Sequence, residues 1–238
     1  MSADGAHGRL RALVIQHEQP TPGGYVHQWL EERGADQDVY RIDVEDRDVD
    51  ARDYGMVVSL GSEFAAFDDS IPWIEKERRL LLDAGRAEVP VLGICFGGQL
   101  LARVLGGRAF RSEIAEIGWL PVRSQDGALV SDGPWFQWHF DSFSVPTGAR
   151  LIADSVVGPQ AYTIGRSLGV QFHPEVTPEI MQAWVKAYRH ELDEEGVDPD
   201  RLLEETYARA EESRAAAWRL FDGFLARARR VKEAVGGS

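Results

Sequence analysis

The amino-acid sequence predicts an α/β fold, in which a mixed, mainly parallel central sheet is flanked by helices, with added antiparallel strands and a helical C-terminal extension. Three observations lead to this expectation. Up to residue 106, apolar runs of strand length alternate with helical segments, and parallel strands need such crossover helices. Beyond residue 106, shorter runs alternate apolar and polar residues between turn residues, which is typical of antiparallel strands. From residue 198 onward, Ala, Arg, Glu and Leu dominate, as in amphipathic helices.

The first half of the chain contains runs such as "LRALVIQ" and "VPVLGIC", whose continuous apolar character is typical of strands covered on both faces. The helices between the strands are marked by Pro72 near the first turn of one, and by Gly34 and Gly85 near the ends of two. In chain order, the expected elements are a strand over residues 10–16, a helix over 23–34, strands over 38–44 and 54–61, a helix over 72–85, a strand over 89–95 and a helix over 97–106.

The second half is expected to add antiparallel strands to this core, with one of them returning to the parallel part. A helix over residues 177–192 follows, because Thr177 is a suitable N-cap and Pro178 suits the first turn. The last residues form one or two amphipathic helices, whose apolar stripe indicates core packing more than a partner site. We therefore divide the chain into a main domain over residues 1–195 and a helical extension over residues 196–238. The added strands are expected over residues 116–124, 135–143, 149–155, 160–166 and 168–173.

The composition narrows the classes of function. With 44% hydrophobic and 27% charged residues among 238, and no run of about 18 apolar residues, the chain is expected to be globular and not to enter a membrane. A net charge of −13 argues against a nucleic-acid partner, because phosphate backbones repel acidic surfaces. One cysteine cannot form an intrachain disulfide, and neither a metal nor a cofactor is indicated. Since the N-terminus does not resemble a signal peptide, we expect a cytoplasmic protein that acts on a small molecule or another protein.

The one cysteine, Cys95, stands in "VLGICFGGQLL" between an expected strand and an expected helix. A tight turn at such a place is a nucleophile elbow, which exposes a reactive side chain at the carboxyl edge of a sheet. Gly93 and Gly97 remove Cβ atoms that would crowd the turn, and the N–H of Phe96 is directed toward the reacting centre, where it favours a thiolate and then an oxyanion. An isolated cysteine is more often a small core residue, so the glycine spacing alone leaves both interpretations open.

A cysteine nucleophile needs a base, and the base needs a group that orients its ring. Among the six histidines, His173 ends the strand-like run "LGVQFH", and Glu175 follows two residues later, so an imidazole and a carboxylate can face one site. His7, His27 and His190 occupy ordinary terminal or helical positions. A surface histidine beside an acidic residue is the commoner meaning of this spacing, but it is disfavoured once the spacing is combined with the elbow.

Together, "GICFGGQ" and "QFHPE" resemble the motifs of the class I, or triad, glutamine amidotransferase family, whose members release ammonia from glutamine. The resemblance extends over about residues 10–192, and the two motifs in this order and spacing are highly specific. The stretches "EIGWLPV", "WHFDSFSVP" and "GVQFHPEVTPEI" most resemble the free-standing branch that is similar to the amidotransferase domain of GMP synthase. The resemblance implies a flavodoxin-like sheet and makes the main domain a catalytic one.

The resemblance also implies roles for individual residues. Cys95 matches the nucleophile, His173 the general base and acid, and Glu175 the carboxylate that orients the histidine. The implied reaction is attack of the thiolate on a γ-glutamyl amide, departure of ammonia or an amine, and hydrolysis of the γ-glutamyl thioester. The oxyanion is expected to be bound by the N–H groups of Phe96 and Gly61.

Three further residues match the family near its substrate pocket. Gln99 is expected to help define the pocket, and His139 and Asp141, in "WHFDSF", are expected at its edge. A structural histidine and a turn aspartate are the alternative interpretation of the last two. One loop departs from the family pattern, because this chain has Leu60, Gly61 and Ser62 where many relatives have Gly-Gly-Pro, which leaves the second oxyanion donor open.

Three functions are compatible with these motifs. The first is a glutaminase or amidotransferase subunit, acting on glutamine, that works with a separate synthetase. The second is a free-standing hydrolase or peptidase for other γ-glutamyl compounds, since the same thioester chemistry serves both. The third is a binding or regulatory module that retains the fold without catalysis, and the intact set of Cys95, His173 and Glu175 argues against it.

Overall fold

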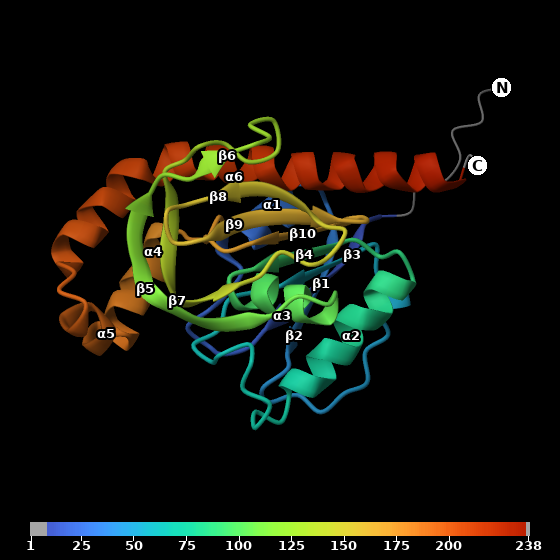
Figure 1. Ribbon diagram of the computed structural model, residues 1–238, viewed down its shortest axis with the longest axis horizontal. Coiled ribbons are helices and arrows are strands. Elements are labelled where there is room, and N and C mark those ends of the chain that lie inside the picture. Colours follow the sequence, from blue (N-terminus) through green and yellow to red (C-terminus); the bar gives the residue numbers. More distant parts are fainter. Residues whose placement is uncertain (1–8, 237–238) are drawn as a thin grey trace.

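The structure is a computed structural model that describes residues 9–236, so His7 and the outermost residues of the two expected domains lie outside the described part. Its centre is a sheet of eight strands in the order β2-β1-β3-β4-β10-β9-β8-β6 (Figure 1). Neighbours from β2 to β10 are parallel, and β9, β8 and β6 are added antiparallel, which confirms the mixed, mainly parallel sheet. The strands are β1 (Arg11–Gln16), β2 (Asp36–Arg41), β3 (Met56–Ser59), β4 (Val91–Ile94), β6 (Arg123–Ser124), β8 (Arg150–Asp154), β9 (Pro159–Ile164) and β10 (Ser167–Val170).

Helices cover both faces of this sheet, because successive side chains of a strand point to opposite faces. In β1, Ala12 and Val14 pack in the cluster that holds α1 and α6, whereas Leu13 and Ile15 pack in the cluster that holds α2 and α3. Within residues 9–236, no helix combines the length and apolar character needed to cross a membrane. The helices named here are α1 (Gly24–Glu32), α2 (Ile74–Arg86), α3 (Phe96–Val104) and α6 (Pro199–Gly236), and a short 3-10 helix, η1 (Ala51–Asp53), precedes β3.

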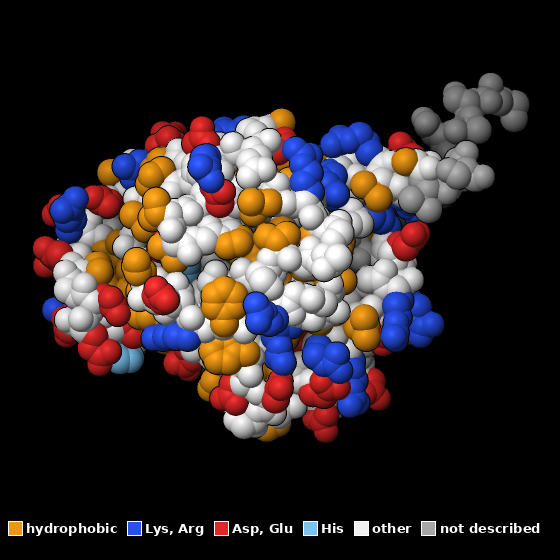
Figure 2. Space-filling view, in the orientation of Figure 1, with side chains coloured by type: hydrophobic (Ala, Val, Ile, Leu, Met, Phe, Trp, Pro, Cys, Tyr) orange, Lys and Arg blue, Asp and Glu red, His pale blue; other side chains and the backbone are white. Residues whose placement is uncertain are grey.

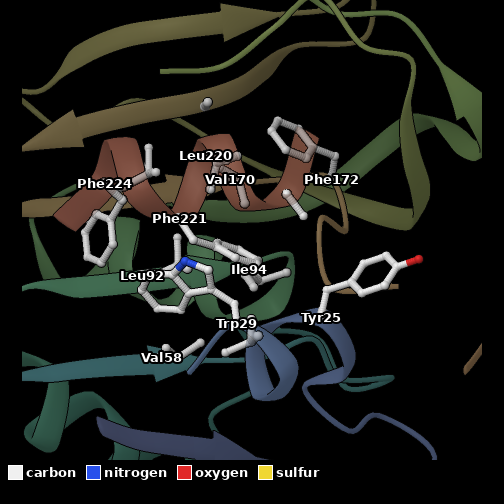
Figure 3. Packing of buried hydrophobic residues seen from close by; sticks show 14 of the residues in the cluster. Tyr25, Trp29, Val58, Leu92, Ile94, Val170, Phe172, Leu220, Phe221 and Phe224 are labelled. Carbon is white, nitrogen blue, oxygen red and sulfur yellow. The ribbon is translucent and has the colours of Figure 1, made fainter. Parts of the chain in front are cut away.

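The C-terminal segment is one continuous helix, α6, whose colour runs from orange to red in Figure 1. Phe221 of α6 is fully buried, and its ring centroid lies 5.4 Å from that of Trp29 of α1. Figure 3 shows both side chains over Leu92 and Ile94 of β4, in the same cluster as Phe224. The apolar stripe of α6 thus packs on the sheet, and the boundary between two domains at residue 196 stays a prediction.

Two of the expected strands pair apart from the central sheet. They are β5 (Ala109–Leu120) and β7 (Trp135–Phe143), which form a separate antiparallel ribbon. The expectation that all the later strands join the parallel core was therefore wrong for this pair. The physical reason is that Phe136 and Trp138 of β7 pack against Ile180 and Trp184 of the following helix, so the ribbon curves away from the sheet (Figure 1).

The helix expected over residues 177–192 is interrupted. It begins as predicted, since the Thr177 hydroxyl accepts a backbone N–H of the first turn, but it ends at Tyr188 and a second helix follows. Trp184 and Leu192 are both buried, and Tyr188 lies midway between them, so the apolar spacing suits one helix and does not mark the break. The two helices are α4 (Pro178–Ala187) and α5 (Arg189–Glu194).

Candidate active site

Cys95 occupies the turn between β4 and α3, at the carboxyl edge of the parallel strands. Its backbone has φ +51° and ψ −109°, and Glu88 is the only other non-glycine residue with a positive φ within residues 9–236. A conformation of this kind costs roughly 1–3 kcal/mol and persists only where the surroundings enforce it. The Cys95 N–H donates to the Val170 carbonyl of β10 at 2.9 Å. The structure thus places Cys95 in the elbow that the sequence predicts.

Glycines allow α3 to approach the strands closely enough to form this elbow. A Cβ atom on Gly93 would lie 2.5 Å from the carbonyl oxygen of Gly97, and a Cβ on Gly97 would lie 2.2 Å from the carbonyl oxygen of Ser59 in β3. Gly98 faces β10 in the same way, with 2.6 Å to the carbonyl oxygen of Val170. Side chains at these positions would push the N-terminus of α3 away from the sheet.

His173 and Glu175 follow β10 at the same edge of the sheet, and both are buried. The Nδ1 atom of His173 lies 2.7 Å from Oε1 of Glu175, so the carboxylate accepts the Nδ1–H and orients the ring. The other ring nitrogen, Nε2, lies 3.4 Å from the carbonyl oxygen of Trp138, and Sγ of Cys95 lies 4.0 Å from the same oxygen. Imidazole and thiol therefore converge on one point.

The surroundings of His173 favour its protonated form. Burial lowers the pKa of His173, but the Glu175 carboxylate and the Cys95 thiolate outweigh burial, and the pKa lies well above its ordinary value. An imidazolium beside a thiolate is the reactive pair of cysteine nucleophiles. The arrangement can therefore attack a carbonyl carbon with the sulfur atom and deliver a proton from Nε2 to a leaving group.

Two backbone N–H groups next to Cys95 are available for an oxyanion. Among the hydrogen bonds of the described residues, neither the N–H of Phe96 nor the N–H of Gly61 has a partner. Gly61 lies directly beside the reacting groups, since a Cβ on it would be 3.0 Å from Cε1 of His173 and 3.8 Å from Cβ of Cys95. These are the two positions that the resemblance assigns to the oxyanion hole.

Gln99, His139 and Asp141 all line the pocket around Cys95. The Gln99 side-chain amide donates to the carbonyl oxygen of Asp141 and to Oε1 of Gln171, each at 3.2 Å. Nδ1 of His139 lies 3.0 Å from the carbonyl oxygen of Asp141. Gln99 and His139 thus brace the pocket wall through the Asp141 backbone, which is a structural role alongside any contact with substrate.

Asp141 lines the pocket, and its carboxyl group pairs with a cationic side chain. Burial raises the pKa of Asp141, and Arg111 in part lowers it. Arg111 pairs with Asp141 across the β5–β7 ribbon, and its Nη1 lies 3.4 Å from Oδ1. Nε2 of His139 lies 3.2 Å from Oε2 of Glu116 without the alignment of a hydrogen bond.

The rest of the pocket is aromatic and acidic. Phe64, Trp138, Phe140 and Tyr188 contribute rings, and Glu63 and Glu191 contribute carboxylates. Figure 2 shows hydrophobic side chains gathered near the centre of the molecular face, with charged side chains of both signs around them. Within the described residues, no group of three or more His, Cys, Asp or Glu side chains is placed to hold a metal ion.

Two residues near the site were missed from the sequence. Gln171 is fully buried and donates its side-chain amide to Sγ of Cys95 at 3.6 Å. His17 is also fully buried and contacts the carbonyl oxygen of Gly61. A signal existed for both, because Gln171 lies inside the motif "QFHPE" and His17 directly follows a parallel strand, whose carboxyl end meets the edge that carries Cys95.

Comparisons with known proteins agree with this geometry. Residues 24–186 match the family model described as glutamine amidotransferase class-I. The chain is 42% identical over 104 residues to GMP synthase (glutamine-hydrolyzing) of Thermus thermophilus, which covers 40% of this chain and 21% of that protein. It is 32% identical over 170 residues to the same enzyme of Clostridium novyi, and this alignment covers 65% of this chain and 31% of that protein. A crystal structure of a glutamine amidotransferase from Thermotoga maritima matches with a TM-score of 0.85 and 30% identity, covering 92% of this chain and 99% of that one.

The two kinds of relative differ in length. The chain spans about a fifth to a third of the GMP synthases, whereas it matches the Thermotoga protein over nearly its whole length. The family model itself covers well over half of the chain. The chain therefore belongs to the class I glutamine amidotransferase family and is an enzyme of that family.

Proposed function

We propose that this chain hydrolyses the side-chain amide of glutamine to glutamate and ammonia through a γ-glutamyl thioester on Cys95. The observation that carries the proposal is the convergence of Cys95 Sγ and His173 Nε2 on the Trp138 carbonyl oxygen, with Glu175 bound to the opposite side of the imidazole ring. Membership of the family supports glutamine as the amide. Cys95, His173 and Glu175 then have the roles of nucleophile, acid and base, and orienting carboxylate.

The first half of the reaction forms the thioester. The Cys95 thiolate attacks the side-chain carbonyl carbon, and the N–H groups of Phe96 and Gly61 stabilise the oxyanion of the tetrahedral intermediate. The imidazolium of His173 donates its Nε2 proton to the amide nitrogen, the C–N bond breaks, and ammonia leaves. The products of this half are ammonia, a neutral imidazole and a γ-glutamyl group bound to sulfur.

The second half returns the enzyme to its starting state. Neutral His173 accepts a proton from a water molecule as the water oxygen attacks the thioester carbonyl carbon. The C–S bond of the resulting tetrahedral intermediate breaks, which regenerates the thiolate beside an imidazolium. The released γ-carboxyl group loses its proton to solvent, so one water molecule is consumed for each glutamine.

A second candidate substrate is a γ-glutamyl amide with a substituted nitrogen. The observation that favours it is the pocket lining, where Phe64 and Tyr188 offer rings and Glu63 and Glu191 offer carboxylates to an amine substituent. Glu63 and Phe64 belong to the loop that replaces the Gly-Gly-Pro pattern. The same thioester chemistry applies, with an amine leaving in place of ammonia.

We further propose that the ammonia is passed to a separate synthetase. The support is the length comparison, because the relatives named GMP synthase (glutamine-hydrolyzing) extend far beyond the part that this chain matches. The chain's net charge of −13 favours a basic docking surface on such a protein.

Glutamate release tests the proposed function. Purified chain is supplied with glutamine and with a panel of N-substituted γ-glutamyl amides, and glutamate is measured over time. We expect turnover that is abolished in Cys95→Ala and retained in Glu211→Ala, a matched control at an exposed position of α6. A preference for a substituted amide would favour the second candidate. No turnover on any substrate, with or without candidate synthetases, would contradict hydrolysis and favour a binding module.

A further inference from the structure

A second buried histidine lies behind the loop that carries Gly61. His17 directly follows β1, and its side chain is fully buried. Its Nδ1 atom lies 3.0 Å from the carbonyl oxygen of Gly61, and its Nε2 atom lies 2.7 Å from Oε2 of Glu77 in α2. The other carboxylate oxygen of Glu77 accepts the Ser59 hydroxyl at 2.6 Å. A chain of hydrogen bonds thus connects the ends of β1 and β3 with α2.

The donors and acceptors in this series of hydrogen bonds define where its protons lie. A carbonyl oxygen only accepts, so Nδ1 of His17 carries a hydrogen, and a second proton is shared between Nε2 and the Glu77 carboxylate. Burial lowers the pKa of His17, but Glu77 outweighs burial and holds the pKa above its ordinary value. A buried ion pair of this kind rarely stabilises a fold more than apolar side chains of equal volume would. A role beyond packing is therefore indicated.

The His17 contact completes the restraint of Gly61. Of the two peptide groups that flank Gly61, the first is held through the Leu60 carbonyl oxygen, which accepts the Gly97 N–H at 3.1 Å. The second is held through the Gly61 carbonyl oxygen, which accepts from His17. Glycine is the most flexible residue, so holding both peptide groups limits rotation about the φ and ψ bonds of Gly61. The Gly61 N–H belongs to the first peptide group, and the restraint on the second peptide group holds it indirectly.

The loop beyond Gly61 is held by another acidic residue. Oε1 of Glu18 accepts the Ser62 hydroxyl at 2.7 Å and the Glu63 N–H at 3.0 Å. The His17 ring also contacts the ring of Phe96, at 4.7 Å between centroids. One imidazole therefore touches both residues whose N–H groups are proposed to bind the oxyanion. The loop of this protein also lacks the proline and second glycine of the family pattern.

We propose that His17, held by Glu77, is a positioning residue for the oxyanion hole: its Nδ1–H holds the peptide group between Gly61 and Ser62, which limits rotation at Gly61 and keeps the N–H of Gly61, in the preceding peptide group, directed at the transition state. This inference rests on the proposed function for its catalytic consequence. The described residues that line the pocket include Gly61 but not His17, so the effect of His17 is transmitted through the backbone of Gly61. Its loss should therefore weaken an interaction that exists in the transition state and leave substrate binding largely intact.

A matched pair of double variants tests the kinetic consequence. His17→Leu/Glu77→Gln lacks the donor to Gly61, whereas His17→Asn/Glu77→Gln carries a side-chain amide N–H near the place of Nδ1. Both remove the ion pair, so neither leaves a lone buried charge that would prevent folding. We expect kcat of the leucine variant to be lower than that of the asparagine variant on the order of 10- to 100-fold, with KM within about threefold. Equal kcat values, or a loss confined to KM, would overturn the inference.

Amide hydrogen exchange tests the positioning without relying on activity. The Glu63 N–H donates to Glu18 in the loop that His17 anchors, and its exchange rate reports how often the loop opens. We expect exchange at Glu63 to be about tenfold faster in the leucine variant than in the asparagine variant, with exchange at Val14 of β1 unchanged. Equal rates at Glu63 would overturn the inference. If the wild type releases no glutamate from any amide, the proposed function fails, and this exchange measurement still decides the role of His17.

Discussion

Replacement of Gly97 by alanine tests the close approach of α3 to the sheet, on which the elbow depends. The new Cβ would lie 2.2 Å from the carbonyl oxygen and 2.3 Å from Oγ of Ser59. Ordinary contact begins at 3.4 Å, so helix and strand must separate by roughly 1 Å. Overpacking of this kind costs up to about 3 kcal/mol, and helix propensity returns at most about 1 kcal/mol, which leaves a loss of about 2 kcal/mol in the free energy of unfolding.

The same displacement should reduce catalysis, because Cys95 and the N–H of Phe96 move with the start of α3. A misplacement of about 1 Å can lower a rate on the order of 100-fold. Urea unfolding and glutamate release measure the two effects. The matched control is Gly85→Ala in α2, where a Cβ meets nothing within 4 Å and a gain of up to about 1 kcal/mol is expected. A Gly97→Ala protein with the wild-type unfolding midpoint and turnover would refute the close-approach argument.

Two further predictions concern the C-terminal helix and the base. Phe221→Ala should lower the free energy of unfolding by about 3–5 kcal/mol because the ring is fully buried. The control Glu211→Ala, on the same helix, should change the free energy of unfolding by less than about 0.5 kcal/mol. Equal thermal midpoints of the two variants would show that α6 is not part of the core. Glu175→Gln removes a carboxylate that raises the pKa of His173, so as the pH is raised the variant should lose its imidazolium, and with it activity, at a lower pH than the wild type does. The alkaline limb in the pH profile of kcat should therefore shift to lower pH, and an unmoved limb would contradict this expectation.

The parallel core could be predicted because its strands bury both faces. Residues 12–15 of β1 are all apolar and fully buried, and this pattern differs from that of a half-exposed strand. The start of α4 carried an equally local signal in the hydroxyl of Thr177. These features depend on neighbours in the sequence, so the sequence alone was sufficient for them.

The ribbon and the break at Tyr188 could not be predicted in the same way. Which partner a strand such as β7 selects depends on the long-range contact of Trp138 with Trp184, at 5.9 Å between ring centroids. Strands in which apolar and polar residues alternate have the same sequence pattern whether they extend a sheet or form a separate ribbon. The interruption of the helix at Tyr188 likewise leaves the apolar spacing unchanged. Only packing against the ribbon distinguishes an interrupted helix from a continuous one.

The residues of the candidate site likewise fall into a group that the sequence predicts and a group that depends on long-range contacts. Cys95, His173 and Glu175 lie within two short motifs whose residue types and spacing relate directly to chemistry. His17 has no motif around it, and its partner Glu77 is sixty residues away in α2. Its place next to Gly61 follows only once β1 and β3 are known to be neighbours in the sheet. Residues that support a site through long-range contacts are therefore the ones that sequence reasoning misses.

The most direct test of the central claim is the covalent intermediate. Wild-type chain is mixed with glutamine, quenched in acid within one turnover, and measured by intact and peptide mass spectrometry. We predict one added γ-glutamyl group on the peptide that contains Cys95, removed by hydroxylamine as a thioester is, and absent in Cys95→Ala. Since the chain has one cysteine, the assignment is unambiguous. An adduct on another residue, or glutamate release by Cys95→Ala at the wild-type rate, would contradict the account.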